Sequence, residues 1–298
     1  MEASLQETNV AGAFRTKRFV DVGSARVCYR EAGNGPALVL LHGFPLSGMT
    51  WRGLIPELSK RFTCYALDLV GLGDSTSSDN VDFSSRGQGV VMQQALRALG
   101  VSSYALMGND TGGWVARELA ALEPQRVTHL VLTNTEMPGH RPPWIRQYQL
   151  LARVPGSTVL FRSIMASRRL RRSAIAFGGC FNDLDLIDGE FYDEFVVPLI
   201  TSRERLARAL RFLVHMQFGP LDRFRELHGT LSMPVAFIWG ADDPTFPEPA
   251  ARAMASQFPN VAGFTPIPRA KLFFYEEQPE LEAGLVGEGV GGVSETAG

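Results

Sequence analysis

Residues 108–112 read Gly-Asn-Asp-Thr-Gly, which places an aspartate at the centre of a short segment flanked by glycines. The segment follows a strand predicted at Tyr104–Met107 and precedes a helix predicted at Gly113–Leu122. Glycines on either side permit the close backbone approach that a tight strand-to-helix turn requires, and such a turn exposes its central side chain. The start of the helix also favours negative charge there. Asp110 is therefore our candidate for the central catalytic or ligand-contacting residue.

An aspartate in this position favours attack on a saturated carbon. A carboxylate that attacks an ester forms an anhydride, which is a poor route, whereas attack on a carbon that bears a halide or an epoxide oxygen gives an alkyl–enzyme ester. Hydrolysis of that ester requires a water molecule activated by a base within hydrogen-bond reach. The first step therefore needs the carboxylate and the second step needs a base.

The elements that must position this segment alternate between strand and helix. A parallel arrangement is expected because the central runs are apolar throughout, as in strands buried on both faces of a sheet. The strands are predicted at Arg18–Val22, Ala25–Glu31, Ala37–Leu41, Thr63–Leu69, Tyr104–Met107, Leu130–Asn134, Val235–Trp239 and Ala262–Ile267, and the helices at Arg86–Leu99, Gly113–Leu122 and Pro249–Phe258. The pattern predicts an α/β fold with a mostly parallel sheet of about eight strands.

The alternation stops between residues 140 and 231, where only helical periodicity is present. A block of about 90 residues is the size of a domain rather than a loop. We therefore expect a core domain of residues 1–139 and 232–298, interrupted by a helical domain of residues 140–231. The glycine-rich stretch Gly284–Gly298 predicts a disordered end.

Four motifs in this order resemble those of the α/β-hydrolase superfamily. They are Leu-His-Gly-Phe-Pro at 41–45, Asp-Leu-Val-Gly-Leu-Gly-Asp-Ser at 68–75, the segment at 108–112 and Trp-Gly-Ala-Asp-Asp-Pro at 239–244. Asp110 and residues 42–45 most resemble the branch of epoxide hydrolases and haloalkane dehalogenases. The resemblance implies an eight-stranded α/β-hydrolase fold in which residues 140–231 form a cap, with the active site between the cap and the sheet.

The resemblance also implies roles for individual residues. The backbone N–H groups of Phe44 and Thr111 match the oxyanion hole, and Asp243, rather than its neighbour Asp242, matches the acid that orients a histidine base. Glu136 matches the alternative position of that acid in some dehalogenases. Thr111 stands where haloalkane dehalogenases usually have tryptophan and fluoroacetate dehalogenases have arginine.

The histidine of the superfamily is missing from its usual place after the last strand, where this chain has Leu272. The five histidines are His42, His129, His140, His215 and His228, and none follows Asp243. His215, late in the helical block, is a candidate substitute base that would act from above the site. Trp144 and Tyr148, near the start of that block, are candidate pocket residues. His42 is expected to have a structural role, holding in place the loop at residues 41–45 that carries the Phe44 N–H, called the oxyanion loop below.

Three functions remain open on these residues. The first is a hydrolase like an epoxide hydrolase or dehalogenase, in which Asp110 attacks carbon of a small apolar substrate and the alkyl ester accumulates for want of a histidine. The second is a lyase, isomerase or cyclase in which Asp110 moves a proton and no ester forms. The third is a ligand-binding protein without catalysis. The intact strand-to-helix turn at residues 108–112, called the elbow below, favours the first two functions. The missing histidine favours the last two.

Composition narrows the partners. The 298 residues are 45% hydrophobic and 20% charged, and 29 basic against 31 acidic residues give a net charge of −2. Such a chain has no long-range field to gather a nucleic acid. Its three scattered cysteines form neither a disulfide framework nor a metal knuckle. With no secretory signal and no membrane-length apolar run, we expect a cytoplasmic protein that binds a small molecule, needs no cofactor or metal, and has no membrane partner. A homodimer is left open.

Overall fold

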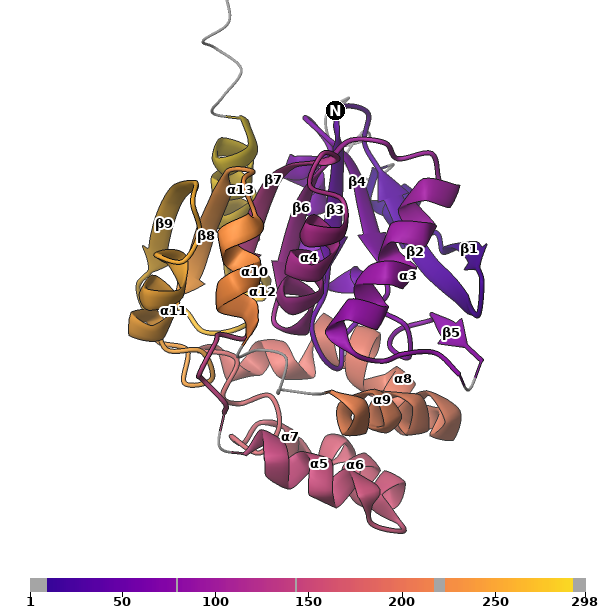
Figure 1. The fold of residues 1–298 in the computed structure, drawn as a ribbon. Helices are drawn as coiled ribbons and strands as arrows, with labels where there is room; N and C mark the ends of the chain where they lie inside the picture. Colours follow the sequence, from indigo (N-terminus) through magenta and orange to yellow (C-terminus); the bar gives the residue numbers. More distant parts are fainter. Residues whose placement is uncertain (1–9, 79, 143, 217–222, 292–298) are drawn as a thin grey trace, which may run out of the picture.

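The computed structural model describes residues 10–78, 80–142, 144–216 and 223–291. Its centre is a nine-stranded sheet in the order β1-β2-β4-β3-β6-β7-β8-β9, with β5 paired to β2 (Figure 1). The strands are β1 (Arg18–Val22), β2 (Ala25–Ala32), β3 (Ala37–Leu41), β4 (Thr63–Leu67), β5 (Thr76–Ser77), β6 (Tyr104–Asn109), β7 (Val127–Thr133), β8 (Val235–Gly240) and β9 (Val261–Ile267). The pairs among β3, β4 and β6 to β9 are parallel. The strand β2 pairs antiparallel with β1, β4 and β5. The predicted α/β fold and mostly parallel sheet are confirmed, and the short β5 is the added strand.

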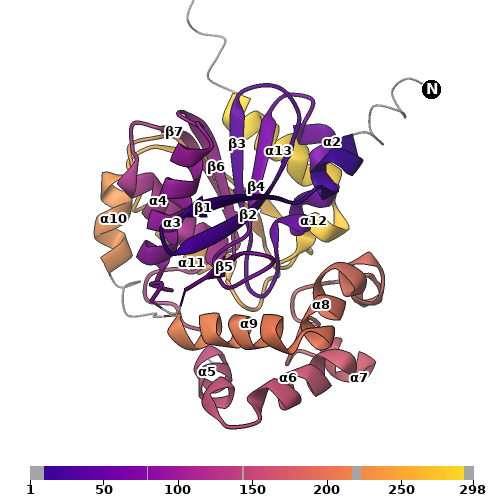
Figure 2. The same ribbon diagram turned by 90° about the vertical axis from the view of Figure 1, so that its right-hand side faces the viewer.

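Helices cover both faces of this sheet, which explains why the central strands are apolar throughout. Every residue of β6 and β8 is buried, as expected of strands shielded from water on two sides. Figure 2 shows α3 (Ser85–Ala98), α4 (Thr111–Leu122) and α11 (Glu248–Ala255) on one side of the sheet. The helices α2 (Ile55–Leu58), α12 (Phe274–Glu277) and α13 (Pro279–Gly291) lie on the other side. In the described residues, no helix combines the length and the apolar character needed to cross a membrane.

The helix α13 corrects one expectation. Disorder was predicted for Gly284–Gly298, but residues 284–291 are helical, and residues 292–298 lie outside the described part of the chain. A Cβ added at Gly289 would lie 3.2 Å from the Cβ of Ala236, and one added at Gly287 would lie 2.6 Å from Arg61 Nη1. Glycine lowers helix propensity, but here it lets α13 approach the sheet closely, and this packing outweighs the local preference.

Between β7 and β8 the chain forms a separate layer of helices below the sheet in the view of Figure 1. We call residues 145–215 the cap. It comprises α5 (Ile145–Arg153), α6 (Ser157–Ala166), α7 (Arg168–Arg171), the short 3₁₀-helix η2 (Leu184–Asp188), the short π-helix η3 (Tyr192–Val196), α8 (Val197–Thr201) and α9 (Arg203–His215). The predicted boundary at residue 231 would add α10 (Phe224–Thr230) to it. However, α10 packs on α4 of the core, where Phe224 meets Trp114 at 6.2 Å between ring centroids.

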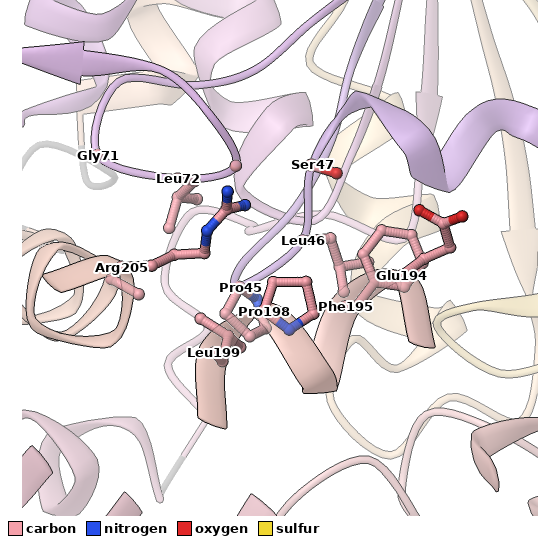
Figure 3. Close-up of a pocket in the computed structure, with 12 residues that line it drawn as sticks. Pro45, Leu46, Ser47, Gly71, Leu72, Glu194, Phe195, Pro198, Leu199 and Arg205 are labelled. Carbon is pink, nitrogen blue, oxygen red and sulfur yellow. The ribbon is translucent and has the colours of Figure 1, made fainter. Parts of the chain in front are cut away.

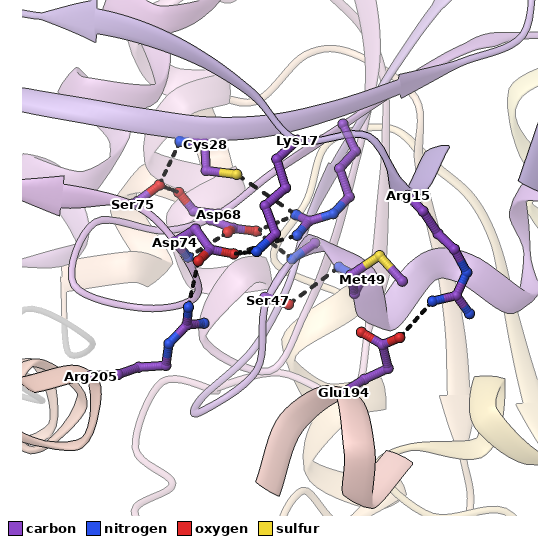
Figure 4. A network of polar contacts seen from close by, with 12 residues as sticks. Arg15, Lys17, Cys28, Ser47, Met49, Asp68, Asp74, Ser75, Glu194 and Arg205 are labelled. Carbon is purple, nitrogen blue, oxygen red and sulfur yellow. Dashed lines mark hydrogen bonds and ion pairs between the residues drawn. The ribbon is translucent and has the colours of Figure 1, made fainter. Parts of the chain in front are cut away.

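Ion pairs connect the cap to the core on the side of α8 and α9 (Figure 4). Arg205 at the start of α9 pairs with Asp74 of the core, and Arg15 donates to Glu194 at 2.5 Å. Beside these pairs, a shallow hollow lies between the two layers, lined by Pro45, Leu46, Ser47, Gly71, Leu72 and Gly73 of the core and Glu194, Phe195, Pro198, Leu199, Arg205 and Ala209 of the cap (Figure 3). These ion pairs therefore hold the cap against the core along this edge.

The motif at residues 68–75 has a structural role in this edge. Asp68 is fully buried and accepts hydrogen bonds from Gly48 N at 2.7 Å, Asp74 N at 2.8 Å and Arg30 Nη1 at 3.1 Å (Figure 4). Among the described residues, Cys28, Asp68 and Asp74 have side-chain atoms of the kind that bind metal ions, all within 4.8 Å of one another. Arg30 and Lys17 pair with these carboxylates, so the charge there is already neutralised by side chains.

Candidate active site

Asp110 sits on a strained turn between β6 and α4. Its φ of 49° and ψ of −133° are unusual for a residue with a side chain, and such strain recurs at functional sites. Its N–H donates to the Asn134 carbonyl at 2.8 Å. The neighbouring glycines are required: a Cβ at Gly112 would lie 2.1 Å from the Leu41 carbonyl oxygen, and one at Gly108 would lie 2.5 Å from the Gly112 carbonyl oxygen. The glycine spacing read from the sequence therefore reflects close backbone packing around Asp110.

Two backbone N–H groups point at the Asp110 carboxyl group. Phe44 N donates to Asp110 Oδ2 at 2.8 Å, and the N–H of Thr111 bonds to the same carboxyl group. Gly43 lets the oxyanion loop come this close, because a Cβ there would lie 2.5 Å from Asp110 Oδ2. The structure thus brings together Phe44, Thr111 and Asp110 as expected. Both backbone N–H groups donate to the Asp110 carboxyl group.

Glu136 lies beside Asp110, on the loop that follows β7. Thr111 Oγ1 is 3.3 Å from Glu136 Oε1 and 3.5 Å from Asp110 Oδ2, so one hydroxyl stands within reach of both carboxyl groups. Thr135 Oγ1 lies 3.0 Å from Glu136 Oε2 and 2.7 Å from the Asp110 carbonyl oxygen. The Asp110 and Glu136 side chains therefore form a pair, connected by threonine hydroxyls.

Burial raises the pKa of both carboxyl groups of this pair. For Asp110 the negative charge of Glu136 raises the pKa further, while the N–H groups of Phe44 and Thr111 oppose the rise. For Glu136 the positive charge of buried Arg117 and the hydroxyls of Thr135 and Thr111 oppose the rise. Two such neighbours titrate together, because ionising one disfavours ionising the other. The pair therefore retains one proton to higher pH than an isolated carboxyl group would.

Asp243 lies nearby on the loop after β8 but has a different environment. Its Oδ2 accepts from Asn134 Nδ2 at 2.8 Å and its Oδ1 accepts from Thr245 N at 2.8 Å, and Phe246 N also donates to it. Burial raises the pKa of Asp243 to about 6 despite these donors. Asp243 is close enough for its charge to act on Asp110, yet it is absent from the wall of the cavity described next.

A cavity of about 460 Å³ lies between the core and the cap, next to Asp110. Asp110, Thr111 and Glu136 form its polar floor, and most of the remaining wall is apolar. The core adds Phe44, Pro45, Leu272 and Phe273, and the cap adds Tyr148, Leu151, Phe161, Ile164, Met165, Leu199, Leu206, Ala209, Leu210 and Leu213. Trp144, at the entrance to the cap, also lines it. The predicted pocket residues Trp144 and Tyr148 therefore both reach the cavity.

The histidines lie elsewhere. His215 was a candidate base acting from above, but it is exposed, its ring packs against Phe83 at 5.7 Å, and its Nδ1 lies 2.8 Å from the Arg211 carbonyl oxygen. That interpretation is wrong, because the last turn of α9 turns this side chain away from the cavity wall. His42 is buried, donates from Nδ1 to the Gly43 carbonyl and accepts from Leu69 N, which is the structural role expected of it. No histidine lines the cavity in the described residues.

Two residues near the site escaped the sequence analysis. Cys180 of the cap lines the cavity, and burial, with the charges of Asp243 and Asp110, raises the pKa of its thiol, so the thiol is neutral. Asn134 holds Asp243 and also accepts from Gly240 N at 2.7 Å. Nothing in the local sequence marks Cys180. Asn134 could have been noticed as a polar residue directly after a buried strand.

Comparison with known proteins agrees with this architecture. Residues 36–168 match a family model described as alpha/beta hydrolase fold. Haloalkane dehalogenase 2 of Mycobacterium tuberculosis is 26% identical over 281 residues, which cover 92% of this chain and 94% of that protein. A soluble epoxide hydrolase of Corynebacterium sp. is 40% identical over 95 residues, about a third of each chain (32% and 33%).

Solved structures show the same fold. The ligand-free epoxide hydrolase CorEH superposes with a TM-score of 0.76 at 22% identity, covering 92% of this chain and 97% of that one. Haloalkane dehalogenase DbeA from Bradyrhizobium elkani gives a TM-score of 0.74 at 21% identity, covering 95% and 99%. The chain is therefore an α/β-hydrolase-fold protein, and it resembles epoxide hydrolases and haloalkane dehalogenases.

Proposed function

We propose that the protein is a hydrolase of the epoxide hydrolase and dehalogenase type, in which Asp110 attacks a saturated carbon of an apolar substrate. The observation that carries this proposal is the placement of Asp110. Its carboxyl group lies on the elbow, at the floor of an apolar cavity, with Oδ2 held by the N–H of Phe44. The named relatives, a haloalkane dehalogenase and an epoxide hydrolase, support the same reaction class.

The proposed step forms one bond and breaks one. With Oδ2 held by the backbone, Oδ1 of Asp110 is the oxygen that bonds to the substrate carbon, and the bond from that carbon to the halide or epoxide oxygen breaks. The leaving group takes the bonding pair. A halide departs as an anion, and an epoxide oxygen takes a proton from an acid or water. The cavity contributes orientation and exclusion of water, which lower the barrier for a weak nucleophile.

The cavity wall indicates the class of substrate. Because the cap and core surround the carboxyl pair with aromatic and aliphatic side chains, binding energy comes from burial of apolar surface. A cavity of about 460 Å³ falls within the range typical of small-molecule sites, roughly 300–1,000 Å³. We therefore propose an alkyl or aryl substrate with one electrophilic carbon, rather than a sugar or a charged metabolite.

A second function is favoured by the carboxyl pair itself. Because burial raises the pKa of both Asp110 and Glu136, and Leu272 occupies the histidine position, the pair could donate and accept protons without forming an ester, as in a lyase or isomerase. The two functions differ in whether Asp110 becomes covalently bound to the substrate.

A single-turnover experiment in heavy-oxygen water separates these functions. The enzyme, in excess, is mixed with styrene oxide or bromohexane, and the peptide that contains Asp110 is then weighed by mass spectrometry. An ester hydrolysed at the Asp110 carboxyl carbon leaves one heavy oxygen in Asp110 and none in the first product. Heavy oxygen in the product alone would contradict the proposal, because water would then have attacked the substrate directly. An Asp110→Asn variant, which cannot form the ester, is the control.

A further inference from the structure

The second half of the proposed reaction lacks its usual base, since Leu272 stands where the superfamily has histidine. An alkyl ester on Asp110 is stable unless a nearby group removes a proton from the attacking water. That group must line the cavity, because the water must stand next to the Asp110 carboxyl carbon. Among the cavity-lining residues, the carboxyl and thiol groups are those of Asp110, Glu136 and Cys180. The Cys180 thiol is neutral, because burial and two nearby carboxylates raise its pKa.

We propose that Glu136 is the catalytic base that hydrolyses the Asp110 ester, in place of the missing histidine. The inference rests on the proposed function, because it needs an ester on Asp110. Its geometrical basis is the shared hydroxyl of Thr111, which lies 3.3 Å from Glu136 Oε1 and 3.5 Å from Asp110 Oδ2. The shared hydroxyl places a Glu136 oxygen and the Asp110 carboxyl group beside the same side chain at the floor of the cavity.

The surroundings of Glu136 fix its side chain for this task. Thr135 Oγ1 lies 3.0 Å from Oε2. Arg117 Nη2 donates to the Glu136 carbonyl at 2.7 Å, which places a buried cation next to the residue. The second oxygen, Oε1, lies 3.3 Å from Thr111 Oγ1, the hydroxyl that also contacts Asp110. In many hydrolases the catalytic base is likewise oriented by hydrogen bonds to a further residue.

The charge on Asp110 also determines when Glu136 can act as a base. Before the reaction the buried pair holds one proton, because ionising one carboxyl group disfavours ionising the other. Attack on carbon requires the form of the pair in which Asp110 is the anion and that proton is on Glu136. Esterification removes the negative charge of Asp110. Glu136 then loses its proton to solvent and becomes a carboxylate at the point in the cycle where a base is needed.

The proton balance closes over the cycle. The Glu136 carboxylate takes a proton from water as the water oxygen bonds to the Asp110 carboxyl carbon, and the N–H groups of Phe44 and Thr111 stabilise the resulting oxyanion. Collapse of this intermediate breaks the bond to the alkyl oxygen, which leaves as an alcohol with the proton held by Glu136. Asp110 regains a carboxyl group that carries one proton, and the pair shares that proton again.

Glu136→Gln tests the inference, because it replaces the carboxylate by an amide of the same shape. Glu118→Gln is the matched control. Glu118 is a buried glutamate on α4 whose carboxyl contacts Ser85 at 3.3 Å, and it is absent from the cavity wall. Each variant and the wild type are mixed with bromohexane, and bromide release and intact protein mass are followed together. Circular dichroism and thermal unfolding show whether each variant folds.

We expect Glu136→Gln to release about one bromide per enzyme and then stop, with a hexyl adduct on Asp110, whereas Glu118→Gln turns over as the wild type does. The lifetime of the adduct should exceed that in the wild type by about 10²–10⁴-fold, the usual contribution of a general base. Multiple turnover by Glu136→Gln at the wild-type rate, or an adduct of equal lifetime in both proteins, would overturn the inference while leaving the Asp110 nucleophile intact. If neither bromide nor adduct is seen with bromohexane or styrene oxide in any of the three proteins, the proposed function itself fails. Should Glu136→Gln not fold, the single-turnover lifetime is measured on Thr111→Val, which removes the shared hydroxyl and should lengthen it by a smaller factor.

Discussion

Two loops at the same edge of the sheet carry a buried carboxyl group, and they differ in how that group is satisfied. Glu136 follows β7 and Asp243 follows β8, and each side chain belongs to a residue that is 3% exposed. Asp243 accepts bonds from Asn134, Thr245 and Phe246, whereas Glu136 shares a hydroxyl with Asp110 and lines the cavity. Equal burial therefore accompanies unequal access to a substrate.

The comparison indicates which acid still has a chemical role. No histidine lines the cavity in the described residues, so Asp243 has no imidazole there to orient. We propose that Asp243 now stabilises its loop, since its oxygens are engaged by donors on the loop itself and on Asn134. Glu136, which lines the cavity and shares the Thr111 hydroxyl with Asp110, is the acid to which we assign the chemical role. The following predictions test this division of roles.

The largest effect is expected for Asp110→Asn. Asparagine tolerates a positive φ as aspartate does, so the turn should fold, but the amide cannot attack carbon. We expect turnover of any reactive epoxide or halide to fall by on the order of 10⁴-fold or more, measured by product release. Residual activity within a few-fold of the wild type would show that the floor of the cavity works without its nucleophile.

A histidine restored at residue 272 should rescue the Glu136→Gln variant. Leu272 lines the cavity together with Asp110, so Leu272→His would place an imidazole near the trapped ester. We expect the adduct to hydrolyse about tenfold faster or more in the double variant, measured by the decay of the adduct mass. Leu272→Asn in the same background is the control, because it adds polarity without a base; equal rescue by asparagine would contradict the argument.

Asp243→Asn should change turnover by no more than about tenfold, well below the effect at Glu136. Bromide release from bromohexane by the two variants, measured side by side, is the direct comparison. A loss at Asp243 as large as the loss at Glu136 would show that both loops serve the chemistry and would remove the distinction drawn here.

The same variant has a signature in stability. The pKa of Asp243 is raised from 3.8 to about 6 in the folded protein, so between these values the folded state holds a proton that the unfolded state has lost. Stability from this group is therefore greatest at low pH and declines as pH rises through this window. The free energy of unfolding in urea, measured across the window, should fall less steeply with pH in Asp243→Asn than in the wild type. Identical slopes would contradict the raised pKa.

Tyr148→Phe should give the smallest effect. The ring of Tyr148 lines the cavity, but its hydroxyl donates to the Ile175 carbonyl at 3.1 Å within the cap. Removing the hydroxyl should change turnover of styrene oxide by less than about threefold and reduce cap stability by about 1 kcal/mol, the usual contribution of one hydrogen bond. A large loss of epoxide turnover with unchanged bromohexane turnover would instead assign this hydroxyl to protonation of the epoxide oxygen.

The sequence by itself determined eight of the nine strands, the core helices α3, α4 and α11, and the turn that carries Asp110. Alternation and apolar runs are local patterns, so β1 and β3 match their predicted bounds, and the other predicted strands differ from the observed ones by a few residues at either end. The glycines around Asp110 and at Gly43 carry their own signal, because each marks a place where backbone or carboxyl atoms approach too closely for a side chain. The resemblance to the α/β-hydrolase superfamily, rather than the glycines, supplied the expectation that Phe44 and Thr111 meet Asp110.

Only the tertiary structure decided how the other groups are placed around Asp110. Glu136, Cys180 and Leu272 lie far apart in the sequence and line one cavity because β6, β7, β9 and the cap converge there. The direction of His215 depends on how α9 rotates against the core, which its sequence spacing does not specify. Likewise, α13 is helical despite its glycines, and Gly289 lets it approach Ala236 of β8, a contact between distant segments that local propensity does not reveal. The roles of Glu136 and Asp243 differ because partners from distant segments satisfy Asp243 and leave Glu136 facing the cavity.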